Sequence, residues 1–175
     1  METTFNQKVY WTPFIHQQWK MYIAATDKGL CFVGSQNHSF TELYAWSSVR
    51  LPKHDLVEDA QKLQPYITEL IEYFEGTRKV FTFSVDAIGT TFQMTVWNTL
   101  NKIPYGKAYS YSDIAEAIQK PKSVRAVSTA IGANPVLITI PCHRVIGKNG
   151  KLTGFRGGLE MKRELLSLEK IDGNF

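Results

Sequence analysis

The first 35 residues alternate between short apolar runs and polar, turn-forming residues. Val9–Trp11, Trp19–Ala24 and Leu30–Val33 are rich in the β-branched and aromatic residues that favour strands. The segment Asp27–Gly29 has the chemistry of a tight turn between the last two runs. This pattern predicts a small antiparallel sheet at the start of the chain.

Residues 56–75 show a helical period instead. Their apolar positions recur at spacings of three and four, which places them on one helix face, and Gly76 then ends the pattern. Residues 80–85 alternate like a further strand, and residues 86–90 have the composition of a linker. We therefore predict an N-terminal α/β domain with a small antiparallel sheet over residues 1–88.

The second half of the chain has the pattern of short helices. Apolar positions mark helices around residues 92–100, 114–118 and 124–131, and Ser110 or Ser112 can cap the second of these. Residues 136–140 are apolar and β-branched like a buried strand, and residues 159–169 are typical of a last helix. We predict a mostly helical C-terminal domain over residues 89–175 and an overall α+β fold.

The break at residues 120–123 joins two short helices in a helix-turn-helix pattern. Such a pair can bind DNA, or it can be a helical hairpin used only for packing. The solvent face of the second helix carries Arg125 among small residues, Ser123, Ala126, Ser128 and Thr129. A helix that reads base edges usually carries several long polar side chains, so this face favours close fit over sequence reading.

Composition is that of a globular protein, with 43% hydrophobic and 13% aromatic residues. No apolar run approaches the roughly 20 residues that a membrane helix needs, so we expect no contact with a membrane. The opening METTFNQKVYW lacks the basic start and apolar stretch of a secretion signal. We expect a cytoplasmic protein.

Charge is divided unevenly along the chain. Residues 1–88 hold 8 Lys and Arg against 10 Asp and Glu, a net charge of −2, whereas residues 89–175 hold 12 against 6, a net charge of +6. A basic half beside a mildly acidic one indicates that the second half meets a polyanion such as nucleic acid. Many basic domains bind no polyanion, so charge alone leaves both interpretations open.

The chain has two cysteines, Cys31 and Cys142. Two cysteines make no disulfide framework, and a zinc site would need further ligands at close spacing, so we predict no metal. Cys31 lies in an apolar run and is expected to be a small buried side chain. Cys142 follows an apolar run and precedes His143, and a neighbouring base can turn a weakly nucleophilic thiol into a thiolate.

Two interpretations of these site candidates stay open on the residues alone. Cys142 is either a nucleophile or a buried structural cysteine beside an unrelated histidine. Glu169 lies three and four residues after Leu166 and Leu165, near the buried face of the last helix. A carboxylate there needs a partner, such as a histidine to orient, unless the final turn is frayed and solvated.

Several motifs in residues 90–170 occur together. They are Ile-Pro-Tyr-Gly at 103–106, Ser-Tyr at 110–111, Ser-Val-Arg-Ala-Val at 123–127, Gly-Ala-Asn-Pro at 132–135, Pro-Cys-His-Arg-Val at 141–145, Gly-Phe-Arg-Gly-Gly at 154–158, and Glu169. The combination resembles the O6-alkylguanine-DNA alkyltransferases, the methylated-DNA–protein-cysteine methyltransferases. The pentapeptide at 141–145 is the most specific motif, and the first half of the chain matches only loosely.

The resemblance implies a role for each matching residue. Cys142 would accept the alkyl group, His143 would deprotonate it through a bound water, and Glu169 would orient and charge-balance His143. Asn134 would brace the turn that holds Cys142. Tyr111 would donate a hydrogen bond to the departing guanine and help to rotate the nucleotide out of the duplex.

The resemblance also implies contacts with DNA and with the guanine. Arg125 would enter the base stack from the minor groove and fill the space left by the flipped base. The other residues expected at the DNA are Ser110, Ser123, Val124 and Tyr111. The guanine pocket would be lined by backbone groups at Cys142 and Val145, by the loop at Phe155 and Arg156, and by Ile131. Phe155 stands where many relatives have Tyr, so a hydrogen bond from that hydroxyl is absent.

The implied function is DNA repair by a single-turnover transfer from O6-alkylguanine in double-stranded DNA to Cys142, without a cofactor, by a monomer. The main alternative is a non-catalytic helix-turn-helix protein that senses alkyl lesions or regulates transcription. A hydrolase with a Cys-His pair is a further alternative. The sensor would tolerate loss of Cys142, and the hydrolase would turn over repeatedly.

Overall fold

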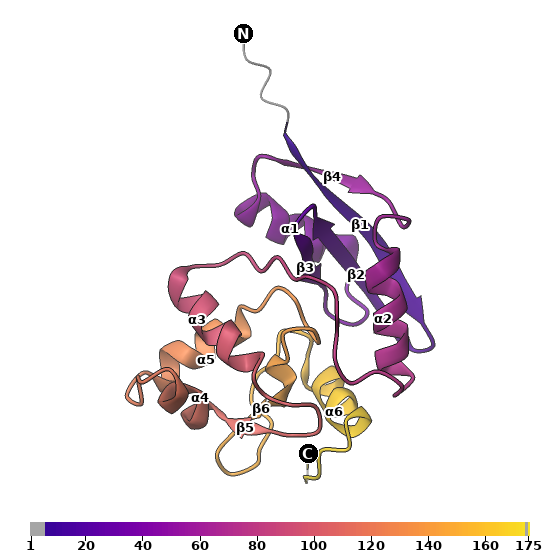
Figure 1. Cartoon of the computed structure of the whole chain (residues 1–175). Helices are drawn as coiled ribbons and strands as arrows, with labels where there is room; N and C mark the ends of the chain where they lie inside the picture. The colour runs from indigo at the N-terminus through magenta and orange to yellow at the C-terminus, as the bar shows by residue number, and fades with distance from the viewer. Residues whose placement is uncertain (1–5, 174) are drawn as a thin grey trace.

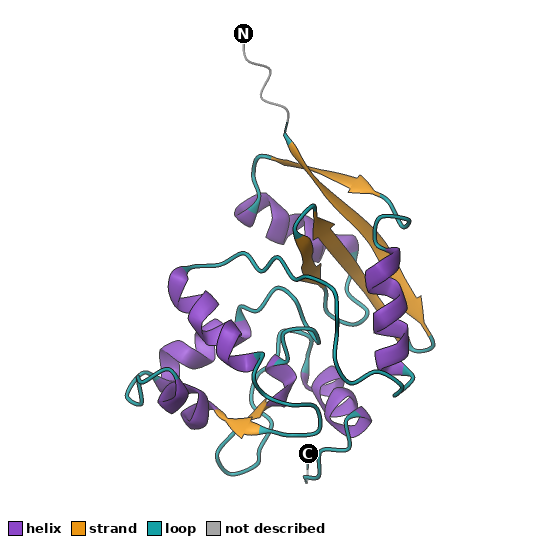
Figure 2. Cartoon of the chain, in the orientation of Figure 1, coloured by secondary structure: helices purple, strands orange, loops and turns teal. Residues whose placement is uncertain are grey.

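The protein folds into two packed halves that follow one another along the chain. The computed structural model describes residues 6–173 and 175. The upper half in Figure 1 contains the larger sheet, and the lower half consists mainly of short helices and loops, as Figure 2 shows by colour. The predicted α+β class, a sheet domain followed by a helical one, is confirmed. The boundary at residues 88 and 89 stays a prediction.

A four-stranded sheet in the order β3-β2-β1-β4 forms the first half. Its strands are β1 (Gln7–His16), β2 (Trp19–Thr26), β3 (Gly29–Val33) and β4 (His54–Glu58). The first three strands pair antiparallel, as predicted, and β4 adds to β1 in the parallel direction. The strand β3 is buried along its whole length, including Cys31, which the sequence placed in the core.

The helix predicted over residues 56–75 is wrong in its first part. Residues 54–58 form β4, and α2 (Gln64–Phe74) begins later, with Pro65 in its first turn. Proline favours the start of a helix because its missing N–H has no partner to lose there. The free edge of β1 offers backbone hydrogen bonds to residues 54–58, which apolar spacing in the sequence does not reveal.

The helix α1 (Phe40–Arg50) was not predicted. Only Leu43 and Ser47 within it are fully buried, so it lacks the repeating apolar stripe from which an amphipathic helix is predicted. It packs near β2 and β3, where Phe32 contacts the ring of Trp46 at 5.0 Å between centroids.

The strand predicted over residues 80–85 is wrong. This segment is an extended strap with one isolated bridge, Leu30 to Val85, supported by the hydrogen bonds Leu30 N to Ser84 O at 3.0 Å and Asp86 N to Leu30 O at 2.8 Å. The alternating pattern arises because Phe81 and Phe83 pack together on the core, at 5.2 Å between ring centroids.

The second half contains the predicted helices. They are α3 (Thr91–Leu100), α4 (Tyr111–Ala117), α5 (Val124–Gly132) and α6 (Leu159–Leu168). Ser110 caps α4 in a reciprocal capping box with Asp113, and α4 and α5 form the predicted helical pair.

The second half also contains one short strand pairing that was not predicted. β5 (Tyr109–Ser110) and β6 (Val145–Ile146) pair in parallel, and the turn η1 (Cys142–Arg144) precedes β6. The segment that contains η1 is therefore paired, through β6, with the strand β5 that leads into α4.

The strand predicted over residues 136–140 is wrong, although the segment is largely buried as expected. It is a compact turn in which Ile138 has a φ of 70° and only Val136 makes a bridge, to Val33 of β3. The side chain of Asn134 binds the backbone of both Val136 and Ile140. Such local side-chain bonds offer the backbone an alternative to a strand.

Within the described residues, the helices are too short and too polar for any to cross a membrane. The prediction that the N-terminal sequence is not a secretion signal rests partly on residues 1–5, which lie outside the described residues. The hydrophobic core extends across both halves, because Leu30 and Val33 of the sheet belong to the same buried cluster as Val136 and Leu137.

We expect Gly29→Ala to destabilise the fold by about 3 kcal/mol or more. Gly29 has a φ of 151°, and an added Cβ would collide with the backbone carbonyl of Ser84 in the strap. Gly76→Ala is the matched control, because Gly76 also has a positive φ but faces open space. It should cost only about 1 kcal/mol. Urea unfolding measures both, and equal losses would show that the strap does not confine Gly29.

Candidate active site

Cys142 lies at the start of η1, directly after the buried turn at residues 136–140. Its side chain is only 3% exposed. The amide nitrogen of Asn134 donates hydrogen bonds to Sγ of Cys142 at 3.1 Å and to the carbonyl of Ile140 at 2.9 Å, and its oxygen accepts one from the N–H of Val136. Asn134 therefore fixes both the thiol and the turn that leads to it.

His143 follows in the same turn and is completely buried. Its Nε2 donates a hydrogen bond to Oε1 of Glu169 at 2.8 Å. Glu169 caps the C-terminal end of α6 and is itself 2% exposed, so the interpretation of a frayed, solvated carboxylate is wrong. Among the described residues, no polar atom is bonded to the other ring nitrogen, Nδ1 of His143. That nitrogen can accept a proton while Glu169 holds the ring.

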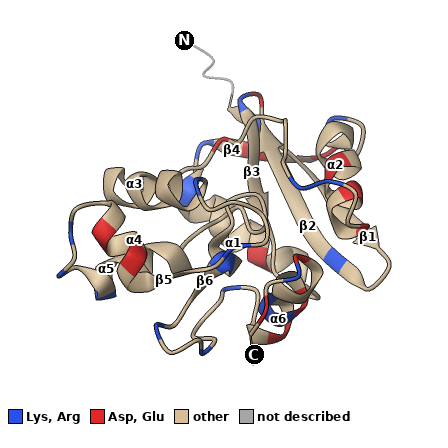
Figure 3. Cartoon of the chain, turned by 60° about the horizontal axis from the view of Figure 1, so that its bottom comes forward, with Lys and Arg blue, Asp and Glu red and all other residues tan. Residues whose placement is uncertain are grey.

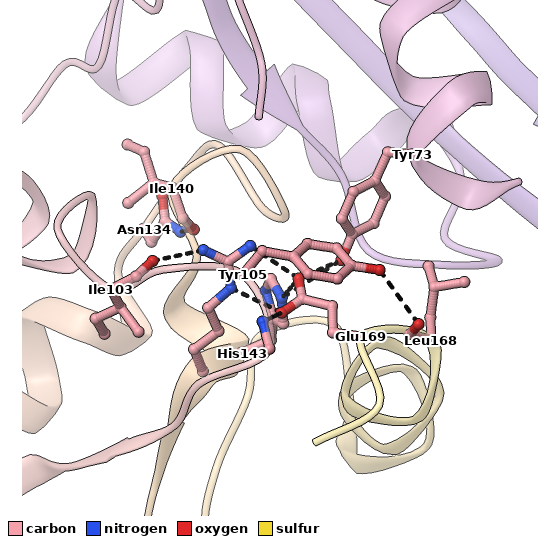
Figure 4. Close-up of polar contacts among 10 residues, drawn as sticks. Tyr73, Ile103, Tyr105, Asn134, Ile140, His143, Leu168 and Glu169 are labelled. Carbon is pink, nitrogen blue, oxygen red and sulfur yellow. Dashed lines mark hydrogen bonds and ion pairs between the residues drawn. The ribbon is translucent and has the colours of Figure 1, made fainter. Parts of the chain in front are cut away.

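The Glu169 carboxylate lies at the centre of a buried polar network, shown in Figure 4. Arg144 donates from Nε and Nη2 at 2.8 and 2.9 Å, and its Nη1 donates to the carbonyl of Ile103 at 2.7 Å. Tyr73 donates its hydroxyl to Glu169 Oε1 at 2.7 Å. Because Tyr73 belongs to α2, the first half of the protein contributes directly to this network.

The network sets the protonation of Glu169 and His143. Burial alone would raise the pKa of Glu169, but the hydrogen bonds and charges of His143 and Arg144 outweigh burial and hold this pKa well below its usual range. Burial lowers the pKa of His143, and the contact with Glu169 opposes this only in part. The imidazole is therefore neutral near pH 7 and able to act as a base.

Burial also raises the pKa of the Cys142 thiol, while the hydrogen bond from Asn134 and the charges of Arg156 and Lys162 lower it. The resting side chain is therefore a thiol, and a base is needed to make it nucleophilic. Lys162 lies on the buried face of α6 with 1% exposure, and burial lowers its pKa to about 8.

A cavity of about 500 Å³ opens beside the sulfur. Its wall includes these predicted site residues: Tyr111, Val124, Ile131, Cys142, Phe155 and Arg156. The structure thus gathers segments from α4, α5, η1 and the loop before α6 around one space. A cavity of this size and mixed lining is suited to a small organic ligand.

Tyr111 lies on this cavity, and its hydroxyl donates to the carbonyl of Thr153 at 2.7 Å. Burial raises the pKa of Tyr111, so the phenol keeps its proton and remains a donor. The role that the resemblance implies, a hydrogen bond to guanine, would require this contact with Thr153 to exchange.

The residues predicted at the DNA lie on α5 and at the starts of α4 and α5. Arg125 is exposed on α5, beside the exposed Ala126 and Thr129. Ser123 precedes the helix and is partly buried. Ser110 is engaged as the N-cap of α4, where its hydroxyl accepts a hydrogen bond from the N–H of Asp113.

Val145 and Arg156, both predicted in the guanine pocket, have other side-chain surroundings. Val145 is fully buried in β6 and does not line the cavity, and the contact expected of it is from its backbone. Arg156 borders the cavity, but its guanidinium binds Glu42 and backbone carbonyls at the junction of the two halves.

Sequence reasoning missed Tyr73, Lys162 and the contact of Arg144 with Glu169. Lys162 could have been found, because it lies three and four residues before Leu165 and Leu166 and so falls on the apolar face of α6. Tyr73 also lies on an apolar helix face, but nothing in the sequence indicates a partner 96 residues away. Within residues 6–173 and 175, no three His, Cys, Asp or Glu side chains gather as metal ligands.

Comparison with known proteins matches this arrangement to one family along most of the chain. Residues 9–87 match the family described as 6-O-methylguanine DNA methyltransferase, ribonuclease-like domain, and residues 91–171 match its DNA binding domain. An inducible methylated-DNA–protein-cysteine methyltransferase of Bacillus subtilis is 59% identical over 170 residues, which cover 97% of this chain and 94% of the relative. The constitutive enzyme of the same organism is 40% identical over 154 residues, covering 85% and 93%.

Solved structures agree. The Mycobacterium tuberculosis O6-methylguanine methyltransferase superposes with a TM-score of 0.78 at 35% identity, covering 93% of both chains. The M. tuberculosis OGT in complex with DNA superposes with a TM-score of 0.79 at 34% identity, covering 92% of both chains. With both halves matched to family domains and a relative aligned over nearly its full length, this chain belongs to the O6-methylguanine DNA methyltransferase family, the methylated-DNA–protein-cysteine methyltransferases.

Proposed function

We propose that this protein repairs DNA by moving the alkyl group, such as methyl, from O6 of a damaged guanine onto its own Cys142. The observation that carries this proposal is a cysteine held at a cavity by Asn134 and followed by a neutral, buried histidine. The protein is a methylated-DNA–protein-cysteine S-methyltransferase that acts once, because a thioether offers no leaving group that would restore the thiol. No cofactor enters the reaction.

The proposed reaction begins with proton transfer from the Cys142 thiol to Nδ1 of His143 through a bound water. Glu169 holds the opposite nitrogen and stabilises the imidazolium that forms. The thiolate attacks the alkyl carbon, a carbon–sulfur bond forms, and the bond from carbon to guanine O6 breaks. The electron pair goes to the guanine, which takes a proton from the Tyr111 hydroxyl, and the proton held by His143 returns to Tyr111 through solvent. The products are unmodified guanine and S-alkylcysteine.

The base must leave the duplex to reach this cavity, because a thiolate cannot approach O6 inside the stack. The cavity is bordered by Val124 and Ile131 of α5, the second helix of the helix-turn-helix. Figure 3 marks Lys and Arg residues in blue on the turn between α4 and α5 and on the loop after β6. Lys148 of this loop borders the same cavity as α5. We propose that α5 lies in the minor groove, with Arg125 in the stack and Ser123 and Val124 beside it.

The two alternatives fit the site less well. A lesion sensor or transcription regulator has no use for a cysteine in contact with Asn134 and next to a histidine–carboxylate pair. A hydrolase would require turnover at Cys142, whereas an S-alkyl product is permanent. We further propose that residues 1–88 and 89–175 are the two domains, that the protein acts as a monomer, and that it works in the cytoplasm, where it can reach DNA.

Cys142→Ala should abolish alkyl transfer while leaving DNA binding in place, because only the acceptor atom is lost. Wild-type protein should take up one alkyl group per molecule, on Cys142, when incubated with excess DNA containing O6-methylguanine. Peptide mass spectrometry locates and counts the alkyl group. Cys31→Ala is the control and should transfer normally, since Cys31 is buried in β3 away from the cavity. Repeated turnover would contradict the proposal.

His143→Ala should slow transfer about 100- to 10,000-fold at neutral pH, the usual cost of losing a positioned base. The rate should partly recover near pH ~9, where bulk base forms the thiolate. Tyr73→Phe, which removes one of the donors to Glu169 but keeps the ring, should give a milder loss with the same pH trend. The second-order rate constant of alkyl transfer is measured against pH for the wild type and for both variants. A folded His143→Ala protein with a profile parallel to wild type would show that His143 is structural.

Arg125→Ala should weaken productive binding to duplex DNA while largely sparing reaction with free O6-benzylguanine. The side chain is exposed on α5 and does not line the cavity, and filling the gap left by a flipped base offsets part of a cost of a few kcal/mol. Transfer rates with the two substrates provide the comparison, with the exposed Lys107→Ala as control. Equal losses with both substrates would place Arg125 in support of the pocket instead.

A further inference from the structure

Arg156 borders the cavity, and its guanidinium joins the two halves of the protein. Its Nε donates to the carbonyl of Asn134 at 3.1 Å, and its Nη2 donates to the carbonyls of Pro135 at 3.1 Å and Val33 at 2.7 Å. Its Nη1 forms an ion pair with Oε1 of Glu42 at 3.0 Å. Asn134 and Pro135 belong to the second half, whereas Val33 and Glu42 belong to the first.

Glu42 lies on α1, and further hydrogen bonds fix its position beside Arg156. Its Oε1 also accepts the N–H of Ser35 at 2.8 Å, and the hydroxyl of Ser35 donates to the carbonyl of Arg156 at 3.1 Å. The guanidinium carbon lies 5.2 Å from the ring centroid of Phe32. The side chains of Arg156 and Glu42 are 22% and 20% exposed, so solvent only partly screens their charges.

These contacts lead to the reactive sulfur in two steps. Arg156 binds the backbone of Asn134, and the side chain of Asn134 donates to Sγ of Cys142 at 3.1 Å. Arg156 directly follows Phe155 in the chain, and Phe155 lines the cavity. The bonds of Arg156 to Glu42 and Val33 therefore anchor this wall of the cavity to the first half of the protein. A reacting thiolate must be placed closely, because a displacement of about 1 Å can cost about 100-fold in rate.

The charge of Arg156 also acts on the Cys142 thiol. The positive charge of Arg156 favours the thiolate, and burial lowers the pKa of Arg156, a shift that the charge of Glu42 opposes. The other titratable or charged groups that face the sulfur or its base are Lys162 of α6, Lys148 after β6, Tyr111 of α4, and the His143–Glu169–Arg144 network. Nδ1 of His38 lies 2.9 Å from the far oxygen of Glu42.

We propose that Arg156 is a positioning residue for alkyl transfer, fixed by Glu42 of the first half, that holds the Asn134 turn and supplies positive charge to the Cys142 thiolate. The proposal rests on the proposed function of Cys142 as acceptor. It assigns the first half a part in the chemistry, since Glu42 and the Val33 carbonyl lie there.

The test measures the pKa of Cys142 from the ultraviolet absorbance of its thiolate against pH, with the Cys142→Ala form of each variant subtracted. No DNA is needed, so this result stands apart from the proposed function: absence of transfer by wild type would refute the function and leave the pKa result intact. Arg156→Gln should raise this pKa by about one unit and slow transfer to DNA about tenfold or more. Glu42→Gln removes charge of the opposite sign and should leave the pKa unchanged or lower it.

Arg156→Lys separates charge from position, and it serves if the Gln variant fails to fold. Lysine keeps the charge but cannot make the same set of bonds, so the pKa should stay near wild type while transfer slows. Arg78→Gln is the matched control, because Arg78 has 25% side-chain exposure and pairs with Glu72 away from the cavity; it should change neither quantity. An unchanged pKa in Arg156→Gln would overturn the proposal. So would equal rises in the Arg156→Gln and Glu42→Gln proteins, or a raised pKa in Arg156→Lys.

Discussion

Burial of the Glu169 carboxylate is the constraint on which the active site depends. A buried carboxylate is stable only when donors meet its oxygens, and loss of one partner of such a pair costs about 3–5 kcal/mol. Here Arg144 contacts both oxygens, and His143 and Tyr73 share one of them. Satisfying this one group fixes the orientation of the imidazole next to Cys142, the position of α6, and the contact between α2 and the second half.

The sheet domain contributes polar groups to the active site in addition to packing against the second half. The first half contributes the Tyr73 hydroxyl to the carboxylate network, and its Glu42 and Val33 hold Arg156 against the turn that carries Asn134. These contacts come from two parts of the first half, α2 and the region of β3 and α1. The position of Cys142 is thus determined by packing between the halves as well as by its own short turn.

The sequence predicted the sheet half before the helical half, the helices of the second half and the first three strands, and Cys142 as the nucleophile stays a prediction. These features depend on local periodicity, caps and a specific pentapeptide. It failed at β4, where the partner strand lies more than 40 residues earlier in the chain, and at residues 136–140, where the Asn134 side chain replaces a strand ladder. The roles of Tyr73 and Glu42 were out of reach because each depends on a partner about 100 residues away.

The position of Glu169 along the chain has a consequence for biosynthesis. Domains fold from the N-terminus as they are translated, so the sheet, the helix-turn-helix and Cys142 are all made before α6. Until Glu169 is added and packed, His143 has no carboxylate to orient it, and Arg144 has no counter-charge. Under the proposed function, a nascent chain therefore holds Cys142 without an oriented base until α6, the last helix, has docked.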